Sequence, residues 1–133
     1  MQTLLPEGWP RPSGYSLGIA AEGRQVHVAG LIGWLPDGSF PSSTLGGQVR
    51  QALQNTVDVL AEAGAGPEHV VRQTWYIRDR DAYLEEIKEI GAAWKDVMGK
   101  NFPAMAVVEI SRLIENKALV EIETYAVLPT DQT

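Results

Sequence analysis

The 133-residue chain contains no cysteine, and its basic residues are few. Without cysteine there can be no disulfide bond, thiolate catalysis or cysteine-based metal site, and the composition fits the reducing cytoplasm, where we expect the protein. Only 11 Lys and Arg stand against 17 Asp and Glu, which gives a formal net charge of −6. Surfaces that bind nucleic acid usually carry a basic patch, so we expect no nucleic-acid partner.

Long apolar runs and cofactor motifs are also missing. No run approaches the roughly 20 apolar residues of a membrane span. The N-terminal residues have neither the basic nor the apolar part of a signal peptide, so we expect no membrane partner. His27 and His69 stand in no metal-ligand spacing such as HExxH, and there is no GxSxG, GxGxxG or P-loop motif. We therefore expect no metal and no organic cofactor.

What is present is the composition of one globular domain over residues 1–133, with 44% hydrophobic and 21% charged residues. Residues 1–14, with three prolines and two glycines, predict an irregular N-terminal arm. Apolar periodicity and turn signals then predict the following elements: a hairpin of strands 15–21 and 25–31, a helix from Ser43 or Thr44 to about Ala63, a strand over 70–77, a helix over 81–98 capped by Asp81, and a hairpin over 101–128. Each helix is expected to bury one apolar stripe, made of Val49, Leu53, Thr56, Val57 and Leu60 in the first and of Leu84, Ile87, Ile90, Trp94 and Val97 in the second.

This order, β-β-α-β-α-β-β, predicts an α+β fold with two helices on one face of a single sheet. Several strands are apolar on both faces; for example, Val26 and Val28 alternate with His27 and Ala29. A sheet that is apolar on both faces needs cover on both, and two helices can cover only one. We therefore expect the second face to be buried against other copies of the chain, with ligand clefts at the contacts between subunits.

Two carboxylates stand in the last, otherwise apolar strand. Side chains alternate between faces with period two, so Glu121 and Glu123 share one face with Leu119 and Tyr125. The two acids are either solvated, or half-buried in a cleft where one of them acts as a general acid or base toward a water molecule.

Two further positions allow both a functional and a structural interpretation. Tyr15, in the segment SGYS, presents its hydroxyl to a ligand or is an ordinary core tyrosine with its tip at the surface. Gly30 and Gly33, at the end of the first long strand, let a ligand approach the backbone or serve a loop that needs positive φ.

Taken together, the motifs resemble the Rid family, also called the YjgF/YER057c/UK114 family, over nearly the whole chain. The matching segments are GYS (14–16) with the family's GPYSQA, VHVAGLIG (26–33) with VFVSGQIP, QVRQALQNTVDVLAEAG (48–64) with QTRQVLENIKAVLEAAG, VVRQTWYIRDRDAY (70–83) with VVKTTVFLKDMNDF, NFPAMAVVEI (101–110) with NFPARSAVEV, and VEIETYA (120–126) with VEIEAIA.

The resemblance implies a chorismate-mutase-like fold and a homotrimer with its sites between subunits. Archetypal members hydrolyse enamines and 2-imino acids to 2-keto acids and ammonia. In those members an arginine binds the substrate carboxylate, a glutamate positions the attacking water, and a tyrosine and a glycine help to hold the substrate. Matched residue by residue, the glutamate is Glu121, the tyrosine Tyr15 and the glycine Gly30.

Two family positions differ: the arginine is Met105 and the glutamine after the glycine is Leu31. Met105 cannot pair with a carboxylate. A substrate-binding pocket made of Met105, Leu31, Trp34 and Phe102, with Glu123 beside Glu121, would be more apolar than in the archetype. The sequence therefore predicts a Rid-like hydrolase acting on an enamine or imine that has a ring or acyl part in place of the usual carboxylate. The alternatives are a trimer that binds a small ligand without catalysis and, less favoured, an endoribonuclease-like activity.

Overall fold

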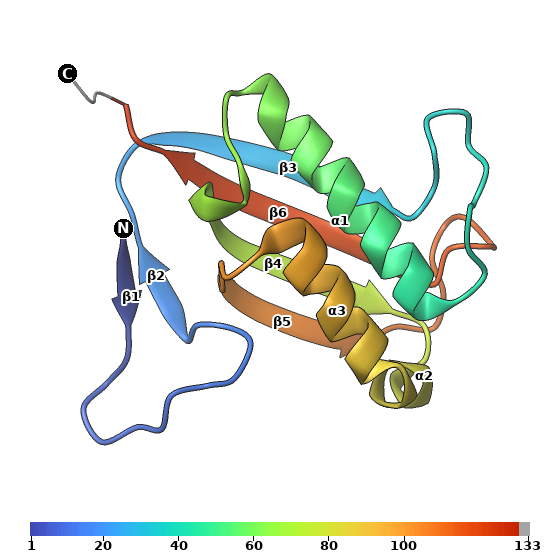
Figure 1. The fold of residues 1–133 in the computed structure, drawn as a ribbon, viewed down its shortest axis with the longest axis horizontal. Coiled ribbons are helices and arrows are strands. Elements are labelled where there is room, and N and C mark those ends of the chain that lie inside the picture. Colours follow the sequence, from blue (N-terminus) through green and yellow to red (C-terminus); the bar gives the residue numbers. More distant parts are fainter. Residues whose placement is uncertain (131–133) are drawn as a thin grey trace.

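The computed structural model describes residues 1–130. A four-stranded mixed sheet, in the order β3-β6-β4-β5, carries helices α1 and α3 across one of its faces (Figure 1). The α+β class and the placement of both helices on one face are thereby confirmed. The elements are β1 (Gln2–Leu4), β2 (Gly18–Ala20), β3 (Arg24–Ile32), α1 (Leu45–Glu62), a 3-10 turn (Pro67–His69), β4 (Val70–Ile77), α2 (Arg80–Glu85), α3 (Ile87–Met98), β5 (Ala104–Glu109) and β6 (Val120–Leu128).

Both predicted hairpins are wrong in their pairing. β6 does not pair with β5; it lies between β3 and β4 and is antiparallel to both, whereas β5 is parallel to β4 at the sheet edge. The segment between β5 and β6 is therefore a crossing connection, because it carries the chain past β4. The central position explains why alternate residues of β6 are fully buried.

The first strand of the other predicted hairpin pairs with the N-terminal arm. β2 is antiparallel to β1 in a separate two-stranded ribbon, and the rest of residues 1–14 is irregular (Figure 1). Residues 21–24, for which the sequence predicted a hairpin turn, form a bend instead, because Arg24 already pairs with Leu128 of β6. Gly23 has a φ of 148°, and a Cβ there would lie 2.8 Å from the carbonyl carbon of Leu128, so the close approach requires glycine.

Helix α1 follows its sequence signals. The Thr44 side chain accepts a hydrogen bond from the Gly47 amide at 3.1 Å, and Gly64, with a φ of 75°, follows the C-cap. The predicted apolar stripe packs onto the sheet, with Val49, Leu53, Thr56 and Leu60 fully buried and Val57 partly buried.

The second predicted helix is divided into α2 and α3. Asp79, not Asp81, caps α2, because its carboxylate accepts hydrogen bonds from the Asp81 and Ala82 amides. The chain leaves helical geometry at Glu86, which separates α2 from α3. Because this break interrupts the helical periodicity, Ala82 and Tyr83 of α2 pack against the core, whereas Leu84 and Ile87, expected in the buried stripe, are 51% and 44% exposed.

Gly91, in the middle of α3, has no atom within 4 Å of the position that a Cβ would occupy. Glycine costs a helix roughly 0.5–1 kcal/mol relative to alanine. We therefore expect Gly91→Ala to raise the free energy of unfolding by about that amount, measured by urea denaturation. A loss of stability would show that the position is less open than the structure indicates.

Candidate functional site

Glu121, Glu123 and Tyr125 lie on the outer face of the sheet, the face opposite α1 and α3. In β6 these half-buried residues alternate with the buried residues Ile122 and Thr124, which face the helices. Cross-strand pairs place Tyr76 of β4 beside Glu121 on the same outer face. Two carboxylates thus stand close together on a sheet face that no helix of residues 1–130 covers.

The carboxylate of Glu121 lies against Gly30 of β3. A Cβ on Gly30 would collide with it, at 2.7 Å from the Glu121 Cδ atom. The irregularity of the β3–β6 pairing between Val28 and Leu31 brings Gly30 into this position. Within residues 1–130, no hydrogen bond or ion pair engages the Glu121 carboxylate. The structure therefore pairs two residues singled out in the sequence and leaves this acid free to meet a ligand or water.

This contact corrects one interpretation of the glycines. Neither Gly30 nor Gly33 has a positive φ, so backbone conformation does not require them. Gly33 is needed because a Cβ would lie 2.6 Å from the Gln48 carbonyl oxygen of α1, and Gly30 is needed for the space that Glu121 fills.

Glu123 is engaged by a neighbour. The Tyr76 hydroxyl donates a long hydrogen bond of 3.5 Å to Glu123 Oε1. The negative charge of Glu123 raises the pKa of Tyr76 above its ordinary value, and desolvation adds to this. Tyr76 thus remains a neutral donor at neutral pH. Of the two acids, Glu121 is the one without a protein partner among residues 1–130.

The raised pKa of Tyr76 is testable by titration. In Glu123→Gln we expect it to fall toward the ordinary tyrosine value of 10.0, because the largest cause of the rise is the charge that this substitution removes. NMR of protein labelled at the tyrosine ring carbons follows each tyrosine separately. An unchanged Tyr76 titration in Glu123→Gln would contradict the contact.

Met105 lies on the other face of the sheet. It pairs across β4 with Gln73, which pairs in turn with Thr124 of β6, and both of these side chains are fully buried on the helix side. Met105 opens into a helix-face cavity of about 550 Å³. Its lining is largely apolar and aromatic: Ser13, Gly14, Tyr15, Trp75, Tyr83, Ile87, Ile90, Gly91, Trp94, Phe102, Met105 and Val107.

Three predicted site residues, Tyr15, Phe102 and Met105, therefore meet in this cavity. Tyr15 is held there by its neighbour Ser16, whose amide donates to the Pro103 carbonyl oxygen at 2.9 Å and whose hydroxyl donates to that of Phe102. Ser16 is buried, so these contacts fix the N-terminal segment on the start of β5.

The wall formed by α2 and α3 was not recognised as part of a site from the sequence. Ile87, Ile90 and Trp94 were assigned to a buried helical stripe, and Tyr83 carried no signal of its own. In the structure they face the cavity, and burial raises the pKa of Tyr83. The apolar periodicity identified the correct helix face, but it could not show that a cavity separates that face from β5.

Leu31 and Trp34 do not join Met105 within one protomer. Leu31 packs against the core opposite Ile122. Trp34 packs against Phe40 in the following loop, with ring centroids 6.0 Å apart. Asn55 of α1 holds this loop by donating to the carbonyl oxygens of Ile32 and Trp34. The predicted single pocket of Met105, Leu31, Trp34 and Phe102 is therefore not formed by one chain.

Two tests for other kinds of site concern the described residues only. Over residues 1–130, no group of three His, Cys, Asp or Glu side chains is arranged to hold a metal ion. In the same part of the chain, no helix has both the length and the apolarity to cross a membrane.

Known proteins resemble this chain along most of its length. The family model described as Endoribonuclease L-PSP matches residues 10–128. A RutC family protein of Pyrococcus abyssi is 31% identical, with 94% of this chain and 95% of that protein covered. The human 2-iminobutanoate/2-iminopropanoate deaminase is 27% identical, with 85% and 79% covered.

Solved structures agree with the sequence relatives. The Rid family protein YyfB of Yersinia pestis superposes with a TM-score of 0.81 at 32% identity, covering 96% of this chain and 98% of that one. A member of the YjgF/YER057c/UK114 family from Mycobacterium tuberculosis has a TM-score of 0.65 at 32% identity, with 87% and 88% covered. The fold, the family model and these relatives together show that this chain belongs to the Rid (YjgF/YER057c/UK114) family.

Proposed function

We propose that this protein hydrolyses an enamine or imine at a site completed between copies of the chain in a homotrimer. The observation that carries the proposal is the free, half-buried Glu121 carboxylate beside a glycine that leaves room for it. The human relative named as a 2-iminobutanoate/2-iminopropanoate deaminase supports the reaction class.

In this reaction Glu121 acts as a general base. It accepts a proton from a water molecule as the water oxygen bonds to the imine carbon, and the C=N π electrons move to nitrogen. The protonated acid returns this proton to nitrogen, which gives a carbinolamine. Glu121 then takes the proton of the carbinolamine hydroxyl and passes it to the nitrogen, the C–N bond breaks as the C=O bond forms, and a carbonyl compound and ammonia leave. An enamine first takes a proton on carbon to become the imine. The step needs no oxidant, metal or organic cofactor.

The positions of the two half-sites support assembly. Glu121 and Met105 lie on opposite faces of one sheet, so a single protomer cannot present both to one small ligand. The outer face carries half-buried side chains and the apolar residue Val108, which is 42% exposed. A second protomer packed on this face would cover it and bring its own cavity toward Glu121. That the assembly has three subunits is inferred from the family resemblance.

Met105 and its aromatic surroundings support the choice of substrate. An arginine at this position would bind a carboxylate, and losing such a charge-assisted contact costs about 1.5–3 kcal/mol, roughly 10- to 100-fold in affinity. Around Met105 the cavity instead offers Trp75, Trp94 and Phe102. The proposed substrate therefore has a ring or acyl part where a 2-imino acid has its carboxylate.

The test compares two substrate classes by ammonia release. Purified protein is mixed with imines generated from amino acids and, separately, with enamines that carry an aromatic or acyl group. We expect the second class to be turned over with the higher kcat/KM, and Glu121→Gln to abolish that turnover. Robust hydrolysis of the amino-acid imines that survives in Glu121→Gln would overturn the proposal.

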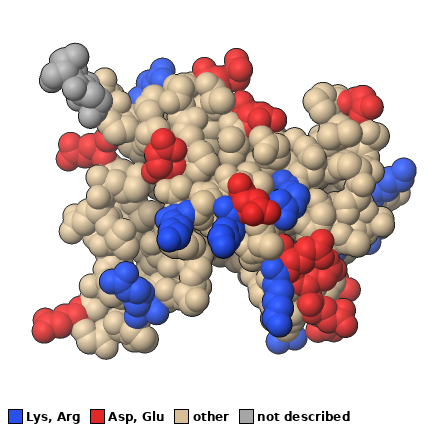
Figure 2. Space-filling model, viewed as in Figure 1, with Lys and Arg blue, Asp and Glu red and all other residues tan. Residues whose placement is uncertain are grey.

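A non-catalytic trimer that binds a small ligand is the second candidate, and the loss of the arginine at Met105 is the observation that favours it. The same variant separates the two, because Glu121→Gln would leave ligand binding largely intact and there would be no turnover to lose. An RNA substrate is not favoured. The net charge is −6, and Figure 2 shows acidic and basic side chains interspersed rather than a continuous basic patch on the face in view.

A further inference from the structure

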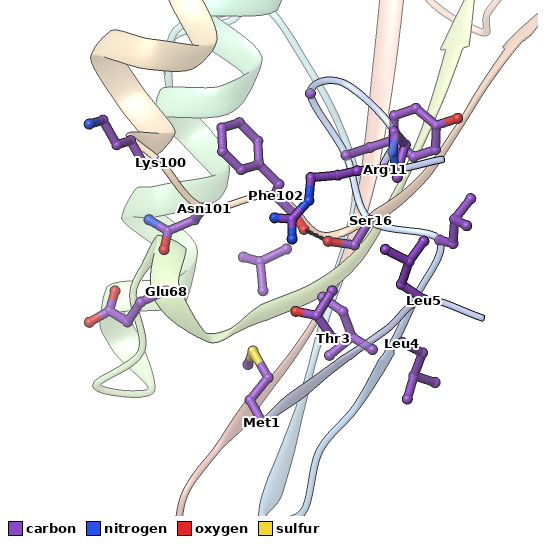
Figure 3. A pocket seen from close by; sticks show the side chains of 16 residues that line it. Met1, Thr3, Leu4, Leu5, Arg11, Ser16, Glu68, Lys100, Asn101 and Phe102 are labelled. Atoms are coloured by element: carbon purple, nitrogen blue, oxygen red, sulfur yellow. Dashed lines mark hydrogen bonds between the residues drawn. The ribbon is translucent and has the colours of Figure 1, made fainter. Parts of the chain in front are cut away.

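A second cavity of about 520 Å³ adjoins the helix-face cavity. It lies between the N-terminal segment and the body of the domain, and we call it the arm cavity (Figure 3). The two cavities share Gly14, Tyr15 and Phe102 as lining residues. Tyr15 and Phe102 are 40% and 43% exposed, so they form a partition that a ligand can contact from either side.

Arg11 is the cation that enters the arm cavity. Figure 3 shows its side chain directed inward, toward the segment of Asn101 and Phe102, whereas the Lys100 side chain is directed away. Among residues 1–130 the ion pairs are Arg50 with Asp96 and Arg80 with Asp81, so Arg11 forms none, although the acid Glu68 also lines the arm cavity. Its guanidinium is available to an anion.

The backbone at Arg11 is restrained before any ligand arrives. Arg11 stands between Pro10 and Pro12. Proline fixes its own φ, and a residue that precedes proline is held to extended conformations. Five residues later, Ser16 is hydrogen-bonded to the start of β5. Because little backbone freedom is left to lose, binding an anion here costs less conformational entropy than it would on a mobile arm.

We propose that Arg11 binds the carboxylate of a ligand whose apolar part lies against Tyr15 and Phe102. The ligand class is an acid with a ring or short apolar chain between its carboxylate and its reacting carbon. Arg11 would thus recognise the acid from a different direction than an arginine at position 105. The identity of the reacting group rests on the proposed function, but recognition of the acid does not, and it can be measured without turnover.

The experiment uses two probes that differ in charge at one end, cinnamate and its neutral amide, cinnamamide. Binding to the full-length protein is measured by titration calorimetry. We expect wild type to bind cinnamate about 10-fold more tightly than cinnamamide, at the low end for a charge-assisted contact because Arg11 is exposed. Arg11→Gln should remove this preference. Lys100→Gln, a matched change in a lysine that also lines the arm cavity, should keep it.

Other outcomes overturn the proposal. These are equal binding of the two probes by wild type, a preference that survives in Arg11→Gln, a preference lost in Lys100→Gln, or no binding of either probe at millimolar concentration. The same titrations in Glu121→Gln should give the wild-type preference. If Glu121→Gln has no effect on turnover while Arg11→Gln removes the preference for cinnamate, the proposed reaction fails and the acid-binding site stands. If Glu121→Gln abolishes turnover while Arg11→Gln keeps the preference, only the role of Arg11 fails.

Discussion

Glu121→Gln is expected to lower kcat for ammonia release about 10²- to 10⁴-fold, the usual contribution of a positioned general base. Glutamine keeps the shape of the side chain but cannot accept the proton of the attacking water. KM should change little, because the apolar part of the substrate contacts the other half-site. The measurement is steady-state ammonia release on the aromatic or acyl enamine that the wild type turns over best.

Glu123→Gln is the matched control for this variant. It removes a carboxylate from the same face of the same strand, but this carboxylate already accepts a hydrogen bond from Tyr76. We expect its kcat to stay within a few-fold of wild type. An equal loss in both variants would show that charge on the outer face, and not a specific base at Glu121, supports the reaction.

Gly30→Ala is expected to reduce turnover about 100-fold, a typical effect of moving a catalytic group by about 1 Å. The added methyl group would collide with the Glu121 carboxylate. The carboxylate is the far end of a flexible side chain, so we expect Glu121 to move while the sheet stays folded. Circular dichroism and urea denaturation check the fold, and steady-state kinetics measures the loss.

A double variant shows whether Gly30 acts through Glu121. If it does, adding Gly30→Ala to Glu121→Gln should cost almost nothing further, because the displaced group is already inactive. Fully additive losses in the double variant would mean that Gly30 contributes independently of Glu121.

Local patterns in the sequence predicted the local structure well. Thr44 caps α1, the stripe from Val49 to Leu60 is its buried face, and β6 alternates between buried residues and the outer-face acids. These features depend on residues a few positions apart, so periodicity and capping chemistry suffice to find them.

Contacts between distant segments were not predictable in the same way. The turn signal at 21–24 was compatible with a hairpin, but β2 pairs with β1 and β3 pairs with β6. The pairing of β6 between β3 and β4 depends on burial of the whole sheet, not on the loop that precedes β6. The contacts from Ser16 to Phe102 and Pro103, which fix Tyr15, join segments far apart in the chain.

The family resemblance singled out Glu121, Gly30, Tyr15 and the position of Met105, but it could not show how one chain distributes them. The strand register places Glu121 and Gly30 on the outer face and Met105 on the helix side, where Tyr15 lines the same cavity as Met105. That separation is the physical reason to expect one site to draw on two protomers.

Subunit complementation tests this shared site most directly. Glu121→Gln removes the base, and Gly91→Trp fills the helix-face cavity from a helical position with no atom within 4 Å of its Cβ. Each variant alone should be inactive. Co-assembled in equal amounts, they should recover about a quarter of wild-type ammonia release, because random mixing leaves that share of interfaces with both halves intact. A mixture as inactive as its parents would contradict a site shared between protomers.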